Sequence, residues 1–181
     1  MKKQALLFAV LASVASFNLY AGNTYVGAGL GIQSIDATTS KFRGWRPGLF
    51  IGYGDRMDED NDCYYLAGEL AISWASEMSD QYVLRTQSLR ISPEVSISLL
   101  PGMIFAPDTM GYLRLGLGEG RQKVTGNWLR VVIVGAGLEY NLTPAWAIRG
   151  EVDYSIFKTV AVIGTPRSWD GTISLKYTYD A

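Results

Sequence analysis

The segment that decides the fold reads Trp146-Ala-Ile-Arg-Gly-Glu-Val-Asp-Tyr-Ser-Ile-Phe157. Apolar residues alternate with charged or small ones along it, and a period of two residues puts the two sets on opposite faces of a β-strand. One face is apolar, and the other carries Arg149, Glu151 and Asp153. A soluble barrel would turn the apolar face inward, whereas a barrel in lipid would turn it outward.

The same alternation recurs along the rest of the chain, and it predicts eight strands. We expect them at residues 24–33, 44–53, 63–75, 83–99, 110–118, 128–141, 145–157 and 168–179. Eight is the smallest strand number of outer-membrane barrels, and most of these segments are near the 9–11 residues that a tilted strand needs to cross a bilayer. We therefore predict an all-β protein, an eight-stranded antiparallel up-and-down transmembrane β-barrel.

The tryptophans favour the lipid-facing interpretation. All five lie on the apolar faces and close to strand ends: Trp45, Trp74, Trp128, Trp146 and Trp169. An amphipathic ring prefers the lipid headgroup region, whereas aromatic residues of a soluble core would fall in mid-strand with mixed parity. We therefore predict an aromatic girdle and an apolar outer wall. Arg130 also has outward parity, which is tolerable because it lies one step from a loop and can extend into the headgroups.

The opposite faces carry charges of both signs. The expected lumen residues are Arg46, Glu69, Arg90, Glu94, Arg114, Glu139, Arg149, Glu151, Asp153, Asp170 and Lys176. Side chains fill the interior of an eight-stranded barrel, and a buried charge without a partner is costly. We therefore expect an ion-pair network in a plugged lumen. The alternative is a conducting path past the arginines.

The N-terminus has the pattern of a secretory signal peptide. Lys2-Lys3 precede an apolar run over residues 5–14 and a small-residue exit that ends at Ala21. We expect a signal peptide at residues 1–21 and the barrel at residues 22–181, in the outer membrane of a Gram-negative bacterium. No later apolar run approaches 20 residues, so an integral protein would have to be a closed barrel. A net charge of −1 argues against nucleic acid as a partner.

The connections between strands predict two different ends. With the first strand entering from the periplasm, turns near residues 54–62, 100–109 and 142–143 would be periplasmic, and loops near residues 34–43, 76–82, 119–127 and 158–167 would face outside. Basic residues gather on the outer side: Lys41, Arg43, Arg121, Lys123, Arg130, Lys158 and Arg167. Cations at this height can pair with lipopolysaccharide phosphates, although ordinary solvated loops explain them equally well. Pro93 lies inside an expected strand and predicts a bulge there.

Catalysis and metal binding are disfavoured. The chain has no histidine, the commonest general base, and Arg149 shares a face with the paired carboxylates of Glu151 and Asp153. Asp58, Asp60, Asp62 and Glu69 have the spacing of a calcium loop, but its glycine position is occupied by Cys63. Cys63, the only cysteine, cannot form an internal disulfide. We expect no enzyme activity, no metal and no cofactor.

Three segments resemble small outer-membrane barrels. Gly135-Ala-Gly-Leu-Glu-Tyr-Asn-Leu-Thr-Pro144 and Ile148-Arg-Gly-Glu-Val-Asp-Tyr154 are similar to the sixth and seventh strands of the OmpA-like and OmpX/Ail-like proteins. Tyr25-Val-Gly-Ala-Gly-Leu-Gly31 is similar to their first strand. The resemblance implies a structural or surface-interaction role, in envelope integrity or adhesion, with lipid, lipopolysaccharide and the barrel-assembly machinery as partners and an unknown extracellular ligand. The alternative is a narrow channel or carrier for small solutes. A soluble lipocalin-like barrel would require the two faces to be exchanged.

Overall fold

The computed structural model describes residues 23–37, 40–57, 63–74, 79–80, 91–122, 128–158 and 165–179. These residues contain nine strands: β1 (Asn23–Ala37), β2 (Ser40–Arg56), β3 (Tyr64–Ser73), β4 (Ser79–Asp80), β5 (Ile91–Ala106), β6 (Thr109–Gln122), β7 (Trp128–Asn141), β8 (Trp146–Phe157) and β9 (Arg167–Tyr179). Within this part of the chain, no helix has the length and hydropathy needed to cross a membrane.

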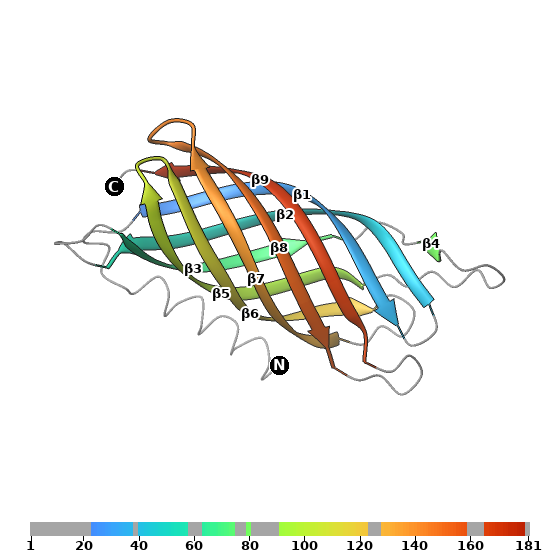
Figure 1. The fold of residues 1–181 in the computed structure, drawn as a ribbon. Helices are drawn as coiled ribbons and strands as arrows, with labels where there is room; N and C mark the ends of the chain where they lie inside the picture. Colours follow the sequence, from blue (N-terminus) through green and yellow to red (C-terminus); the bar gives the residue numbers. More distant parts are fainter. Residues whose placement is uncertain are drawn as a thin grey trace.

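Eight of the strands form a closed antiparallel barrel. Each pairs with the barrel strands before and after it, and β1 pairs with both β2 and β9, which closes the ring. Figure 1 shows the resulting cylinder of tilted strands. The short β4 pairs with β2 at Phe42 and Arg43, outside the ring. The predicted eight-stranded up-and-down barrel is therefore confirmed.

The strands are staggered around the ring. The paired residues that begin at Thr109 on β6 pass through every strand of the barrel and return to β6 at Glu119, ten residues along the same strand. A stagger of this kind makes the strands tilt against the barrel axis. It also means that residues at the same level along the barrel axis are not paired with one another across neighbouring strands.

The barrel has an apolar outside and a polar inside. On β9, Ile173 is 69 % exposed while its neighbour Ser174 is 9 % exposed. Exposed and buried residues also alternate along β7 and β8, and the buried set includes Glu139, Arg149 and Asp153. Toward the loop end of β7 the buried side chains are apolar. A soluble monomer does not expose a continuous apolar surface of this size. The predicted face assignment is therefore confirmed for the described strands.

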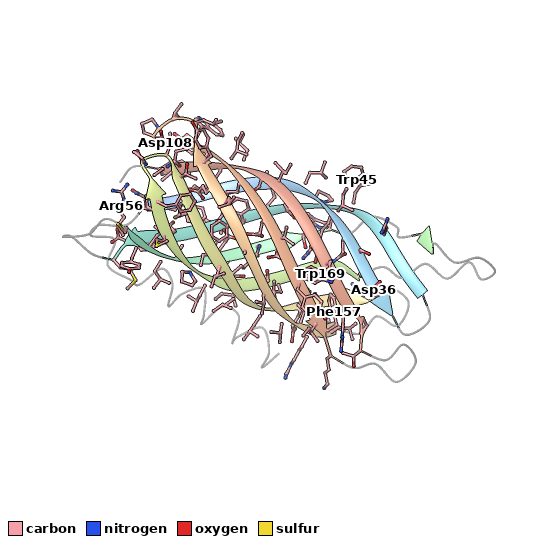
Figure 2. The ribbon with its side chains drawn as sticks, viewed as in Figure 1. Asp36, Trp45, Arg56, Asp108, Phe157 and Trp169 are labelled. Atoms are coloured by element: carbon pink, nitrogen blue, oxygen red, sulfur yellow. The ribbon has the colours of Figure 1, made fainter. Side chains whose placement is uncertain are left out.

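The two ends of the barrel differ. One, here the turn end, holds Asn23, Tyr179 and the short turns at residues 107–108 and 142–145. The other is the loop end, where β1 ends and β2 begins. Figure 2 places Arg56 and Asp108 at the turn end, and Asp36 and Phe157 at the loop end.

The strand that was expected to end at residue 99 is longer on the turn side. The predicted range of the following turn, residues 100–109, was wrong. Strand β5 continues to Ala106, and only residues 107–108 form the turn. Pro101-Gly102 is a usual turn signal, but both residues keep their pairing with Leu66 and Tyr65 on β3. Residues 81–90, which contain the start of the expected strand, lie outside the described residues.

Two further expectations concern the loop end. The loop predicted at residues 34–43 was wrong, because β1 and β2 stay paired as far as Ala37 and Ser40. This continuation brings Ile35 into the lumen, where it is fully buried. The bulge predicted at Pro93 is confirmed, since the β5–β6 register shifts between Ile91 and Glu94.

Candidate functional site: the filled lumen and the outer rim

Aromatic side chains fill the lumen toward the turn end. The cluster contains Tyr25, Ala67, Leu100, Met110 and Tyr112, packed against Phe50, Tyr65 and Ile104. Each of three rings lies across a glycine of the neighbouring strand: Tyr25 faces Gly52, Phe50 faces Gly27 and Tyr112 faces Gly137. A Cβ atom at any of these glycines would collide with the ring. Glycine is therefore required for the rings to lie flat across the lumen.

A large charge cluster begins among these rings. The guanidinium of Arg149 lies 4.8–5.7 Å from the centroids of the Tyr25, Phe50 and Tyr112 rings. Arg149 Nη1 is 2.6 Å from Glu69 Oε2, and its Nε is 3.2 Å from Glu139 Oε2. The buried guanidinium is thus held by two carboxylates and by cation–π contacts.

The cluster extends from Arg149 in both directions. Lys176 forms an ion pair with Glu139. On the other side Arg114 contacts Glu69 at 3.7 Å and Asp153 at 3.4 Å, and it also pairs with Glu151. Hydroxyl groups complete the arrangement, with Tyr112 donating to Glu151 at 2.8 Å. We refer to Lys176, Glu139, Arg149, Glu69, Arg114, Glu151 and Asp153 as the seven-residue cluster.

A smaller charge cluster lies nearer the loop end. Arg46 Nη2 is 2.5 Å from Glu94 Oε1, and Arg46 Nη1 is 3.2 Å from Asp170 Oδ2. Arg46 Nε also donates to Ser73 Oγ at 2.9 Å, and Ser168 Oγ donates to Asp170 Oδ2 at 3.1 Å. The two acidic side chains are only 3 % and 2 % exposed, and the Arg46 side chain is 13 % exposed. We refer to Arg46, Glu94 and Asp170 as the three-residue cluster.

Apolar side chains lie beyond this cluster at the loop end. They project inward from β1, β7, β8 and the start of β9: Ile35, Leu129, Val131, Phe157 and Pro166, all buried. A cavity of about 60 Å³ remains deeper in the lumen, lined by side chains that include Arg46, Arg114, Arg149 and Ser96. Its lining also includes apolar side chains such as Phe50 and Ile133. The charged centre therefore has aromatic side chains on its turn side and apolar side chains on its loop side.

The structure places ten of the eleven expected lumen residues inside the barrel, and Arg90 lies outside the described residues. The inward aromatic residues were missed by sequence reasoning. The parity of Phe50 and Tyr112 was readable, because Phe50 shares its face of the strand with Arg46 and Tyr112 shares its face with Arg114. The calcium-loop residues Asp58, Asp60 and Asp62 lie outside the described residues, whereas Glu69 points into the lumen. No group of three or more acidic, cysteine or histidine side chains in the described ranges could hold a metal ion.

The tryptophans lie on the outer wall at both ends. All five side chains are exposed: Trp45, Trp74, Trp128, Trp146 and Trp169. Figure 2 shows Trp45 and Trp169 toward the loop end. Trp146 lies at the turn end, with its ring centroid 4.8 Å from that of Tyr177. Aromatic rings at two levels are what a bilayer-spanning wall requires.

Basic side chains form a belt at the loop end, near the level of the loop-end tryptophans. Arg121, Arg130, Lys158 and Arg167 lie on the four consecutive strands β6–β9, and Arg43 lies on β2, all with outward parity and exposed. When the ten-residue stagger is shared among eight strands, these five residues fall within about 4 Å of one level. That level lies about 5 Å beyond Trp45 and Trp169. Of the other expected cations, Lys123 and the side chain of Lys41 lie outside the described part of the chain.

Solved structures share this architecture. The crystal structure of Neisserial surface protein A matches with a TM-score of 0.64 and 16 % identity, covering 86 % of this chain and 97 % of that one. The Ail protein of Yersinia pestis, the attachment invasion locus protein, matches with a TM-score of 0.57 and 15 % identity, covering 88 % and 99 %. Identities this low show the fold alone. No curated protein sequence matches the chain.

The family model of the outer membrane protein β-barrel domain matches residues 5–180. This match covers nearly the whole chain, and the apolar wall, the two aromatic levels and the closed ring are those of a bilayer-spanning barrel. The chain therefore belongs to the outer membrane protein β-barrel family, whose place is the outer membrane of Gram-negative bacteria.

Proposed function

We propose that this protein is a structural and surface-interaction barrel, with a role in envelope integrity or adhesion and a lumen that does not conduct. The observation that carries the proposal is the filled lumen. A channel would need a continuous wet path, whereas aromatic rings and ion pairs occupy the turn-end half and apolar side chains occupy the loop end. In this proposal a signal peptide at residues 1–21 directs secretion, the barrel-assembly machinery inserts the mature chain, and the loop end faces outside.

The ion pairs support a structural role because they hold the lumen side chains in place. Arg114 and Arg149 each contact two or more carboxylates, so moving either one would leave buried charges unpaired. Such a displacement costs about 3–5 kcal/mol, which opposes spontaneous opening. An enzyme is the least favoured class, since the chain has no histidine and the described lumen carboxylates are engaged by arginine or lysine.

Surface interaction is supported by the outer wall. The belt of cations lies at headgroup height, where phosphate groups of lipopolysaccharide are within reach. A protein of similar fold, Ail, has been solved in complex with the heparin analogue sucrose octasulfate. Both ligands are polyanions, and a belt of arginine and lysine side chains suits either. We place lipid and lipopolysaccharide first, because the belt lies next to lipid-facing tryptophans.

A narrow channel or carrier for small solutes is the second candidate. It is favoured by the cavity of about 60 Å³ and by the arginines around it. For transport, this cavity would have to connect past Arg149 and Tyr112 to the turn end and past Phe157 to the loop end.

A deletion strain separates the two candidates. We expect the strain to become more sensitive to detergent and to antibiotics too large for porins, or to lose attachment to host-matrix glycans, with full recovery from a plasmid copy. Uptake of small sugars and amino acids should be unchanged. Unchanged sensitivity and attachment, together with slower uptake of a small solute, would overturn the structural role in favour of transport.

A further inference from the structure

The basic belt is concentrated on one wall of the barrel. Arg121, Arg130, Lys158 and Arg167 occupy β6–β9 with one acid, Glu119, among them. Arg130 Nε lies 3.7 Å from Glu119 Oε1, with side chains 76 % and 55 % exposed. A pair so exposed contributes little, so the wall keeps an excess of positive charge.

Two of these cations lie directly opposite each other. Val132 on β7 pairs with Ile156 on β8, and Lys158 N donates to the Arg130 carbonyl oxygen at 2.8 Å. Arg130 and Lys158 therefore project outward from one rung, with Cβ atoms about 4.5–5.5 Å apart. Like charges in this position destabilise a sheet, so the pair is unfavourable unless an anion lies between them.

A third cation lies beside this pair. Arg167 on β9 pairs with Ile156, which makes it the diagonal neighbour of Lys158. The two acids of this region lie on the outer flanks, because Glu119 pairs with Arg130 from the β6 side and Asp36 pairs with Arg167 from the β1 side. The three cations thus lie together, with these two acids on either side of them.

We propose that Arg130, Lys158 and Arg167 form a seat for one phosphate group of an outer-leaflet phosphorylated glycolipid. The seat narrows the lipopolysaccharide contact of the proposed function, on which it rests, to one wall. A phosphate between opposed cations replaces repulsion with charge-assisted hydrogen bonds, and the arginine fork can bind two of its oxygens.

The position of the seat selects a membrane lipid over a soluble anion. Trp169 on β9 lies one outward position closer to the membrane than Arg167, and it pairs with Tyr154 on β8. The ring centroids of Trp169 and Tyr154 are 4.8 Å apart. Trp169 is exposed and Tyr154 is half-buried. Aromatic rings at this height lie in the headgroup region, beside the sugar and the first acyl carbons of a glycolipid. A ligand that fills the seat therefore touches an aromatic surface on its membrane side.

The test measures binding of lipid A with two phosphates to the folded barrel in phosphatidylcholine nanodiscs. The seat variant is Arg130→Gln/Lys158→Gln, and the matched control is Arg43→Gln/Arg121→Gln, which removes the same charge from the same belt without touching an opposed pair. We expect the dissociation constant to rise at least tenfold for the seat variant and less than twofold for the control. Glu119→Gln should strengthen binding severalfold, because it removes a competing anion from the flank.

Three results would overturn the seat. Equal weakening in both double variants would mean a uniform electrostatic belt, and unchanged binding in both would mean no contact. Weakened binding of sucrose octasulfate with unchanged lipid A would mean a soluble glycan site. A heat-dependent mobility shift on a detergent gel verifies that each variant is folded. If the Arg130→Gln/Lys158→Gln variant does not fold, the single variant Lys158→Gln replaces it. The proposal of a non-conducting lumen is tested separately, by measuring the conductance of the same purified protein. Failure of the phosphate seat therefore does not overturn the proposed lumen, and the reverse also holds.

Discussion

The two charge clusters of the lumen differ in how many cations each carboxylate can reach. In the seven-residue cluster, Glu69 contacts both Arg114 and Arg149, and Glu139 contacts both Arg149 and Lys176. In the three-residue cluster, Arg46 is the only described cation in contact with Glu94 and Asp170. The first cluster can lose Lys176 or Arg149 and still leave each of its carboxylates with a described cation. Loss of Arg46 leaves the two carboxylates of the second cluster with no cation among the described residues. The comparison predicts unequal costs for chemically similar substitutions.

Arg46→Met should have the largest effect. It leaves two buried carboxylates without a described cation, and uncompensated buried charges cost about 3–5 kcal/mol. We expect this loss in the free energy of unfolding, measured from tryptophan fluorescence in a urea titration of the barrel refolded into lipid vesicles. The triple variant Arg46→Met/Glu94→Gln/Asp170→Asn should recover most of the loss. A cost below about 1 kcal/mol for Arg46→Met would mean that the carboxylates are hydrated, and would remove the difference between the clusters.

Gly137→Ala tests the aromatic support of the seven-residue cluster. The added Cβ would collide with the Tyr112 ring, which contacts Glu151 and covers Arg149. Overpacking of this kind costs about 1–3 kcal/mol. The control is Gly150→Ala on the lipid face, where a Cβ meets no heavy atom within 4 Å. Equal urea midpoints for the two variants would show that the ring is free to move aside.

Lys176→Met should cost about 1–2 kcal/mol, clearly less than Arg46→Met. Glu139 still has Arg149 as an ion-pair partner at 3.2 Å, so the Glu139 carboxylate is not left as an unpaired buried charge. The same urea titration makes the comparison, with both substitutions removing one buried cation and adding the same side chain. A cost for Lys176→Met as large as that for Arg46→Met would contradict the argument from shared cations.

Tyr112→Phe should have the smallest effect, about 1 kcal/mol, since it removes one hydrogen bond to Glu151 and leaves its ion pair with Arg114. Tyr140→Phe on the exposed outer wall is the control and should be neutral. If Tyr112→Phe exceeds Lys176→Met, the hydroxyl groups rather than the shared cations maintain the larger cluster.

Much of the barrel could be predicted from the sequence because a strand has a period of two. Parity alone separates Ile148 from Arg149 and puts Trp169 outside, whatever its neighbours are. Pairing partners could not be predicted, since Arg149 meets Glu69 across 80 residues and the contact depends on register. The aromatic cluster was missed for the same reason, because the space for the Tyr25 ring comes from Gly52 on another strand.

The stagger of the strands explains why the level of the basic belt could not be predicted from the sequence. Arg43 and Lys158 reach the same height on different strands only because the ladder climbs ten residues around the ring. The sequence pattern of a single strand does not reveal this ten-residue stagger. The early end assigned to β5 has a local cause, since Pro101-Gly102 looks like a turn but remains paired with β3.

Single-channel recording in a planar lipid bilayer tests the central claim, that the lumen is filled, most directly. The folded barrel should insert without producing stepwise conductance in salt solution. The variant Tyr112→Ala/Phe157→Ala removes one buried side chain near each end of the lumen and should produce conductance steps. Regular ohmic steps from the unmodified protein, at a size reproducible between insertions, would contradict the filled lumen and make the channel the better account.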